Sequence, residues 1–237
     1  MVLLEICVDT INGLHTAVDN GADRIELCSA LSVGGLSPSF ALLTEAQKVG
    51  VPVHVMVRPR AGSFKYSPEE IDGMIQEIIH VKSLGLSGVV FGVGTEVGLD
   101  WPALKQLCLA AAGLDITVHR VVDLLTPEDR LAALPKLGIL GVDRVLTSGG
   151  LTKAVDSIPE LKQLIGAAPE NMVVMPGSGV TASNIEEILA ETSATEIHTS
   201  AGIKTDNQSA KSLELGFENI NSRETSASLV RLLKSLC

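Results

Sequence analysis

The sequence predicts a single α/β domain over residues 1–237, a TIM (β/α)8 barrel in which parallel strands alternate with helices. Two observations support this fold class. Strand-like runs alternate with helical patterns eight times, and no long polar linker interrupts the alternation. The length of 237 residues also matches the roughly 250 residues of a single-domain barrel. An open, doubly wound sheet is the alternative, and it explains the number of strand–helix repeats and the chain length less well.

The strands are short apolar or alternating runs, and a segment with helical periodicity follows each of them. We expect strands at 2–7, 23–28, 52–58, 88–92, 115–120, 143–148, 172–176 and 195–200. We expect helices at 10–20, 38–49, 67–84, 101–112, 126–137, 153–167, 181–190 and 223–236.

Three of the helix starts carry capping signals. Ser67-Pro68-Glu69-Glu70 and Thr126-Pro127-Glu128-Asp129 each place a hydroxyl at the cap and a proline in the first turn. Thr181 precedes a further helix. These residues support the helix boundaries, and we assign them no catalytic role.

Six strands carry polar or charged side chains in the phase where a parallel sheet normally carries Val, Ile and Leu. The segments are Leu3-Leu4-Glu5-Ile6-Cys7, Arg24-Ile25-Glu26-Leu27-Cys28, His54-Val55-Met56-Val57-Arg58, Thr117-Val118-His119, Arg144-Val145-Leu146-Thr147-Ser148 and Glu196-Ile197-His198-Thr199-Ser200. Burying such groups costs on the order of several kcal/mol each unless they are paired. We therefore expect a site inside the barrel.

Composition excludes several classes of partner. Lys and Arg number 18 against 28 Asp and Glu, and no window concentrates basic residues, so we expect neither a nucleic-acid nor an anionic-membrane partner. The longest apolar runs, around 51–57 and 86–93, are far shorter than the roughly 20 residues that span a bilayer. The first residues have no basic segment and reach Glu5 early, so we expect no secretory signal and a cytoplasmic location.

The carboxyl-terminal face of the barrel carries candidate anion-binding residues. Glycines and hydroxyls follow the last three strands, among them Ser148, Gly177, Gly179 and Ser200, and the helix start near residue 181 directs its positive end to the same place. These residues predict a phosphate or carboxylate site. The alternative is that the glycines only form the turns of short loops.

Two arginines close the third strand. Arg58 is in the inward phase, where its guanidinium group can bind an oxyanion in a bidentate way, and Arg60 follows it at the mouth. The alternative for Arg58 is an internal salt bridge to Glu26 or Glu5.

Candidate acid–base residues lie in the same interior. Glu5 and Glu26 occupy equivalent inward positions on neighbouring strands, and two close carboxylates raise one pKa. His119 ends the fifth strand, with Asp123 one short turn beyond, and His198 has a similar inward position. We name Glu26, His119 and Asp123 as catalytic candidates. The alternative is a buried ionic layer in which the glutamates neutralise arginines.

The four cysteines do not have the spacing of a disulfide framework or of a paired zinc motif. Cysteines without such spacing are typically reduced thiols. Cys7 and Cys28 each lie two residues beyond an inward glutamate, so their sulfurs can approach one another at the rim. Soft thiolates suit Cu(I). The alternative is a pair of small buried thiols that pack like apolar groups. Cys108 belongs to an apolar helix face, and Cys237 is a terminal free thiol.

Residues 202–221 lack clear periodicity and are rich in Ser, Asn and Lys. We expect a long loop after the eighth strand, and one hypothesis is that it covers the barrel mouth.

At these residues the chain closely resembles the CutC family, described as copper homeostasis proteins with a TIM-barrel fold. The matching stretches are Glu5-Ile6-Cys7-Val8-Asp9, Gly21-Ala22-Asp23-Arg24-Ile25-Glu26-Leu27-Cys28, Gly34-Gly35-Leu36-Ser37-Pro38-Ser39, Arg58-Pro59-Arg60, Phe64-Lys65-Tyr66-Ser67, His119-Arg120-Val121-Val122-Asp123, Arg144-Val145-Leu146-Thr147-Ser148-Gly149, Met175-Pro176-Gly177-Ser178-Gly179-Val180 and Glu196-Ile197-His198-Thr199-Ser200-Ala201. Ala61-Gly62-Ser63-Phe64 replaces the usual Gly-Gly-Asp-Phe, Val121-Val122 replaces Ala-Phe, and the tail from about Gly202 differs.

The resemblance implies Cu(I) as the bound ion, with Cys7 and Cys28 as its ligands. The arginines and glycine loops instead predict a small anionic molecule, because a Cu⁺ site is better placed away from cations. Three hypotheses therefore stand: a cytoplasmic copper-binding protein, an enzyme acting on a small phosphorylated or carboxylated substrate, and an oligomeric scaffold with an ionic core. We also expect a homo-oligomer.

Overall fold

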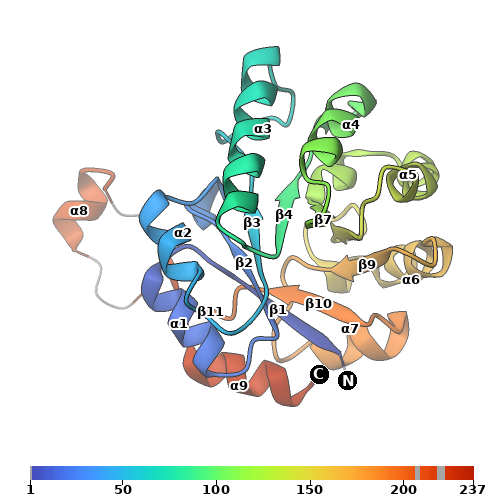
Figure 1. Cartoon of the computed structure of the whole chain (residues 1–237). Helices are drawn as coiled ribbons and strands as arrows, with labels where there is room; N and C mark the ends of the chain where they lie inside the picture. Colours follow the sequence, from blue (N-terminus) through green and yellow to red (C-terminus); the bar gives the residue numbers. More distant parts are fainter. Residues whose placement is uncertain (1, 206–208, 218–221) are drawn as a thin grey trace.

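The computed structural model describes residues 2–205, 209–217 and 222–237. Within these residues, eight parallel strands form a nearly closed barrel with helices around its outside (Figure 1), as the alternation predicts. The strands are β1 (Leu3–Val8), β2 (Arg24–Leu27), β3 (Val53–Met56), β4 (Gly88–Phe91), β7 (Asp115–Val118), β8 (Arg144–Thr147), β9 (Val173–Pro176) and β10 (Glu196–Thr199). The helices around them are α1 (Ile11–Asp19), α2 (Phe40–Ala46), α3 (Pro68–Ser83), α4 (Trp101–Ala110), α5 (Pro127–Ile139), α6 (Ile158–Ala167), α7 (Ile185–Thr192) and α9 (Ala227–Ser235).

The strands follow one another around the barrel in chain order, and the first and last strands of the barrel, β1 and β10, pair as well. The hydrogen-bonded order is β10-β1-β2-β3-β4-β7-β8-β9. β9 and β10 also lie next to each other, but no backbone ladder joins them among the described residues. The barrel therefore brings residues from both ends of the sequence to β1.

Alternate side chains along each strand lie in two different environments. The apolar phase faces the helices: Leu4, Ile6 and Val8 of β1 are fully buried and belong to the main apolar core. The helices contribute fully buried residues such as Leu14 and Met74 to the same core. The other phase points to the barrel axis, which is why the polar residues of the sequence meet there.

The connections at the ends of the strands contain short elements that shape the barrel mouth. They are η1 (Leu31–Val33), η2 (Arg120–Leu124), η3 (Ala154–Ser157) and the antiparallel pair β5 (Gly94–Thr95) and β6 (Gly98–Leu99).

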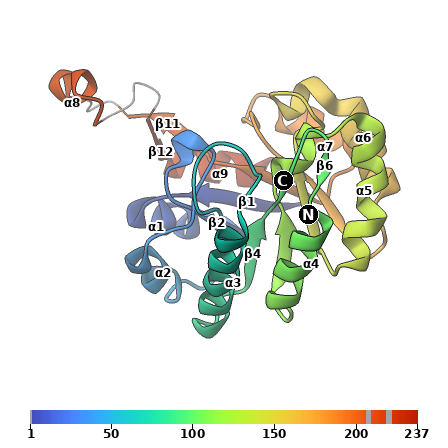
Figure 2. The same ribbon diagram turned by 90° about the horizontal axis from the view of Figure 1, so that it is seen from above.

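The segment after β10 is not a simple loop. Gly202–Lys204 forms β11, which pairs antiparallel with β12 (Arg223–Thr225), and α8 (Ala210–Glu214) lies between them. Figures 1 and 2 show α8 standing away from the barrel rather than over its mouth. Residues 206–208 and 218–221 of the expected loop lie outside the described residues.

Three expected helix starts are wrong. Residues 154–157 form the 3-10 helix η3 instead of the start of an α-helix, and α6 begins at Ile158, with Pro159 in its first turn. Residues 223–225 are a strand, because they pair with β11 in a contact that no local pattern encodes, and α9 begins at Ala227. The expected start at 181 shifts to Ile185, because the Asn184 side chain accepts from the Thr181 N–H at 2.8 Å and holds a turn there. The capping signals at Ser67 and Thr126 are confirmed, since each hydroxyl accepts a backbone N–H of its helix.

None of the helices in the described part of the chain has the length and apolar character needed to cross a bilayer.

Candidate functional site

A buried ionic layer lies inside the barrel, between β1, β2, β8 and β10. Arg24 donates to Glu5 and to Glu196, each at 2.5 Å. Arg144 donates to both oxygens of the Glu196 carboxylate, at 2.5 and 3.1 Å. All four residues are buried, so each charge is neutralised by protein partners rather than by water.

The carboxylates of this layer are held in their ionised form. Burial alone would raise the pKa of Glu5, but the hydrogen bond with His198 and the charge of Arg24 hold it well below its usual range. Burial also opposes ionisation of Glu196, and the hydrogen bonds from Arg144 and Arg24 keep its pKa below the ordinary value. The layer thus fixes two negative and two positive groups at the barrel axis.

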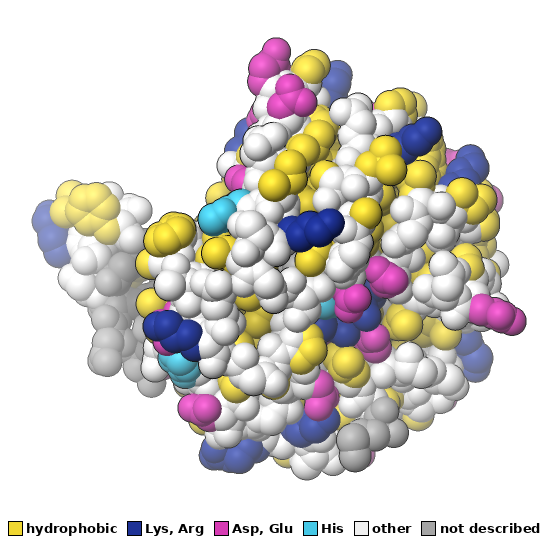
Figure 3. Space-filling model, in the orientation of Figure 1, with side chains coloured by type: hydrophobic (Ala, Val, Ile, Leu, Met, Phe, Trp, Pro, Cys, Tyr) yellow, Lys and Arg dark blue, Asp and Glu magenta, His cyan; other side chains and the backbone are white. Residues whose placement is uncertain are grey.

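On the face shown in Figure 3, acidic and basic side chains lie together near the centre, and other charged side chains are scattered around the edge, among apolar side chains of the surrounding helices. The four residues of the ionic layer are buried beneath the surface.

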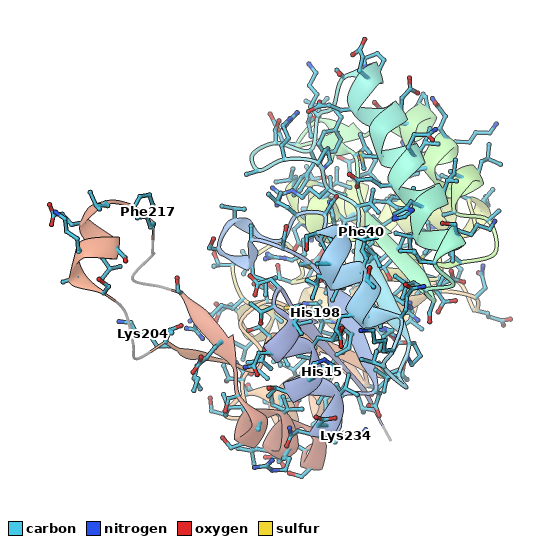
Figure 4. The ribbon with its side chains drawn as sticks, turned by 60° about the vertical axis from the view of Figure 1, so that its left-hand side comes forward. His15, Phe40, His198, Lys204, Phe217 and Lys234 are labelled. Atoms are coloured by element: carbon cyan, nitrogen blue, oxygen red, sulfur yellow. The ribbon has the colours of Figure 1, made fainter. Side chains whose placement is uncertain are left out.

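Next to this layer, Cys7 of β1, Glu26 of β2 and His198 of β10 form a cluster. One possible ligand atom from each of the three lies within 4.8 Å of the others, and all three residues are buried. The pairing of β1 with β2 sets Cys7 opposite Glu26, and the pairing of β10 with β1 sets His198 opposite Glu5. Figure 4 shows His198 within the barrel, far from Lys204 and Phe217 on the projecting segment.

The orientation of the His198 ring is fixed by Glu5. Nδ1 lies 2.7 Å from Glu5 Oε1, and Nε2 lies 3.9 Å from Glu26 Oε2. An imidazole whose Nδ1 is bound to a carboxylate presents its Nε2 to the space opposite, as in the carboxylate–histidine–metal arrangement. Glu5 is therefore suited to orient His198 rather than to bind a ligand itself.

The protonation states of the cluster follow from burial and neighbouring charge. Burial alone would lower the pKa of His198, but Cys7, Glu26 and the hydrogen bond with Glu5 raise it well above its ordinary value. Burial raises the pKa of Glu26 and that of Cys7. The Cys7 thiol is thus neutral near pH 7, so a metal ion that binds its sulfur must displace a proton.

The donor set of the cluster fits a metal ion. Glu26 Oε1 is buried and has no hydrogen-bond partner in the described part of the chain, an unusual state for a carboxylate oxygen. Thiolate and imidazole ligands suit both Cu(I) and Zn(II), whereas a carboxylate oxygen favours the harder Zn(II). Cys7 and His198 are each 8% exposed, so the cluster is buried without being completely closed off from solvent.

Cys28 lies one inward position further along the barrel axis. Its thiol donates to Glu26 Oε2 at 3.4 Å. On its other side it packs with Met56 and Val90, and Leu31 covers this small apolar cluster. Cys28 is fully buried, and burial together with the charge of Glu26 raises its pKa well above the ordinary value. Glu26 therefore connects Cys28 to the Cys7 cluster.

The two arginines expected to bind an anion are engaged elsewhere. Arg58 Nη1 donates to the carbonyls of Val33 and Gly35, at 2.8 and 2.9 Å, and Nη2 donates to the carbonyl of Gly62 at 3.0 Å. It forms no ion pair with Glu5 or Glu26 among the described residues.

Arg60 lies at the edge of the mouth and pairs with Glu70, with a shortest distance of 2.5 Å. Its Nη2 also donates to the carbonyl of Lys65 at 2.7 Å. Arg60 therefore stabilises the loop after β3, to which Arg58 also donates at Gly62.

The glycine-rich loops are closely packed. A Cβ at Gly177 would lie 2.5 Å from Leu146 Cδ1 and 3.2 Å from His198 Cβ, and one at Gly179 would lie 2.7 Å from Lys153 Cγ. Gly177 permits close packing against the neighbouring strands β8 and β10, and Gly179 permits close packing against the loop that contains Lys153. This agrees with the structural alternative, in which the glycines only form short loops. Ser200 follows Thr199, whose partner in register is Ile6, so it lies at the level of Cys7.

Asp123 and Ser148 form one hydrogen-bonded unit with Arg120. The Asp123 carboxylate accepts from Thr147 Oγ1 and from the backbone N–H groups of Ser148 and Gly150. Arg120 donates to Asp123 at 2.7 Å and to Ser148 Oγ at 2.8 Å. The carboxylate therefore fixes the loop after β8, and it has little capacity left for a proton-transfer role.

His119 faces the loop after β3. Its Nδ1 accepts the Val121 N–H at 3.2 Å, its ring lies 4.6 Å from that of Phe64, and its Nε2 has no partner among the described residues. Burial, with a smaller effect of Arg58, lowers its pKa to about 3. His119 is therefore a neutral imidazole.

Sequence reasoning did not assign a role to Glu196, although its inward phase was the available signal. It also treated Glu5 and Glu26 as a pair, whereas the register sets Glu5 opposite Arg24 and Glu26 opposite Cys7. Two expectations for the remaining cysteines are confirmed: Cys108 is buried in the apolar core, and Cys237 is a free thiol. His15 and His80 lie on helices with exposed surface.

The fold and the cluster together define a TIM-barrel protein with a buried ionic interior and a Cys–Glu–His group near the carboxyl ends of its strands. The CutC family profile matches residues 2–203, and the chain belongs to the CutC family.

Known proteins agree with this assignment over most of the chain. A protein of Sinorhizobium medicae (strain WSM419) named as a CutC family protein is 40% identical, covering 99% of this chain and 95% of its own. The human protein named copper homeostasis protein cutC homolog is 41% identical, covering 99% and 88%. The solved structure of CutC from Streptococcus agalactiae is 31% identical with a TM-score of 0.80, covering 84% and 99%.

Proposed function

We propose that this chain binds copper as Cu(I) in the cytoplasm. Cys7 and His198 of the cluster are ligands, and Cys28, whose thiol contacts Glu26 beside the cluster, is the second thiolate ligand. The observation that carries the proposal is the buried group of Cys7, Glu26 and His198, whose ligand atoms lie within 4.8 Å of one another. The four cysteines are free thiols, which is consistent with a reducing compartment. Copper rather than another soft ion is proposed because of the family.

Glu26 has a separate part in this proposal. Its Oε2 lies 3.4 Å from Cys28 Sγ and 3.9 Å from His198 Nε2, so one carboxylate contacts both halves of the site. A carboxylate is a hard ligand and a poor match for Cu(I). We therefore assign Glu26 to accept a thiol proton when the ion binds, and to offer an oxygen ligand only to a harder ion.

Anaerobic competition between the protein and a chromophoric Cu(I) chelator tests the proposal. The wild type is expected to remove one equivalent of Cu(I) from the chelator, and the Cys7→Ser/Cys28→Ser variant is expected to remove none. The matched control is Cys108→Ser/Cys237→Ser, because these thiols lie in the apolar core and at the chain end. Retained Cu(I) affinity in the first variant would reject the assignment.

The same titration with Zn(II) separates the two ions that suit this donor set. Because the thiols are neutral near pH 7, Cu(I) binding is expected to release protons and to strengthen as the pH rises. A Zn(II) affinity that depends on Glu26 and exceeds the Cu(I) affinity would reject copper as the preferred ion.

The geometry supports the anion-binding enzyme less well. The guanidinium groups of Arg58, Arg60 and Arg120 are each engaged by carbonyls, carboxylates or hydroxyls of the protein itself. Sulfate or phosphate between Arg58 and Gly179 in crystals would reverse this preference.

A further inference from the structure

A short segment between β2 and α2 lies directly over the Cys28 thiol. We call residues 29–37 the cover segment. A Cβ added to its Gly35 would lie 3.1 Å from Cys28 Sγ, and its Leu31 packs against the apolar cluster that contains Cys28. Cys28 is 0% exposed, whereas Cys7 retains 8%. The two thiols of the proposed site therefore differ in how solvent reaches them.

The two ends of the cover segment are joined by backbone hydrogen bonds. Ser29 and Leu36 exchange two backbone hydrogen bonds, at 2.8 and 2.7 Å. Ala30, Gly34 and Gly35 have φ values of +49°, +88° and +82°. The left-handed conformation is costly for an alanine, so contacts with the rest of the protein must stabilise this geometry.

Arg58 supplies the main external contacts. Its Nη1 donates to the carbonyls of Val33 and of Gly35, and Gly35 is the residue that approaches Cys28. Its backbone N–H donates to Ser37 Oγ at 3.0 Å, and its carbonyl accepts the Ser37 N–H at 3.0 Å. One buried residue therefore binds the segment at three points along its length.

Asp9, the residue after β1, makes a second contact with the cover segment. The Asp9 carboxylate accepts the Leu31 N–H at 3.1 Å. Arg58 and Asp9 thus fix the two ends of the short helix η1 and of the turn after it.

We propose that Arg58 is a positioning residue that holds the cover segment closed over Cys28, so that Cys28 is reached only when this segment opens. The inference deepens the proposed function, on which it rests, because it makes Arg58 control the access of the ion to one of its two thiols. Cys7 and His198 then receive the ion first, and closure over Cys28 completes and protects the site.

The test measures the alkylation rate of each cysteine of the metal-free protein with iodoacetamide, followed by mass spectrometry. Arg58→Gln is expected to raise the Cys28 rate at least about tenfold, equivalent to about 1.4 kcal/mol in the opening equilibrium. The Cys108 rate is expected to stay unchanged, since this thiol reports general unfolding. The matched control is Arg60→Gln, because Arg60 lies two residues away and its hydrogen bonds go to Glu70 and the loop after β3.

Asp9→Asn is a milder variant that weakens the Leu31 contact and is expected to raise the Cys28 rate by a smaller factor. An unchanged Cys28 rate in both variants, or equal rises at Cys28 and Cys108, overturns the proposal. Because no metal is present, this result is independent of copper binding. In the Cu(I)-loaded protein, Arg58→Gln is expected to release the ion to the chelator faster, and Arg58→Lys to restore part of the slow release.

Discussion

The buried ionic layer makes a quantitative prediction for Arg24→Met. The substitution removes two ion pairs, each with an N–O distance of 2.5 Å, and it leaves the carboxylates of Glu5 and Glu196 buried. Breaking a buried pair by removing one partner typically costs about 3–5 kcal/mol. Glu5 keeps its contact with His198, and Glu196 keeps Arg144, so we expect a loss near the lower limit, about 3 kcal/mol.

Urea unfolding followed by circular dichroism measures this loss. The control is Lys48→Met, which removes an exposed i,i+3 pair with Glu45 and is expected to leave the urea midpoint nearly unchanged. A double variant with Glu196→Gln should lose less than the sum of the two single variants, because it removes one of the uncompensated charges.

The pH dependence gives a further check on the same layer. The pKa values of Glu5 and Glu196 are lower in the folded protein than the ordinary value of 4.5. Their contribution to stability is therefore fully present above pH 4.5 and is lost as the pH falls toward the folded-state values. The difference between wild type and Arg24→Met should shrink below pH 4.5. A loss at pH 7 equal to that of the Lys48 control would refute the reasoning.

Three other substitutions test separate features. Burial lowers the pKa of His119 from 6.5 to about 3, so the free energy of unfolding should fall as the pH drops through this interval. His119→Asn should reduce this dependence of stability on pH, measured by urea unfolding at several pH values. An unchanged dependence would contradict a neutral His119. Gly177→Ala should cost about 1–3 kcal/mol through its contact with Leu146, whereas Gly166→Ala, with nothing within 4 Å, should not destabilise; equal thermal midpoints would contradict the packing role. Ser67→Ala should cost about 1 kcal/mol by removing a capping box, and no shift in the urea midpoint would argue against it.

Local patterns in the sequence were sufficient for most elements of the fold. The period of two in segments such as Leu3–Val8 and the caps at Ser67 and Thr126 depend on residues within a few positions of one another. The strand at 223–225 was missed because it exists only through pairing with Gly202–Lys204, about twenty residues earlier. Such pairing leaves no local signal.

The candidate site was predicted as a set of inward residues, and its internal arrangement was not. The inward phase of Cys7, Glu26 and His198 follows from strand alternation. The register offsets the inward positions of β1 and β2, so that Glu26 meets Cys7 and not Glu5. A shift of two residues leaves the inward phase unchanged, so the alternation is compatible with either pairing.

The structural roles of Arg58 and Asp123 could not be predicted from their residue types. Each side chain was expected to serve a ligand or a reaction, yet in the structure each is largely occupied by backbone groups of a neighbouring loop. Every residue carries a backbone carbonyl and nearly every one an N–H, so the sequence does not indicate which of them a charged side chain will meet.

The sequence by itself determined that this chain is a barrel with ionisable groups along its axis, because alternation and helical periodicity are set by near neighbours. The tertiary structure alone decided that Glu5 orients His198, that Cys7 joins Glu26, and that residues 29–37 close over Cys28. These contacts depend on strand register and on the folding of loops across the mouth, which are fixed only when segments distant in the sequence pack together.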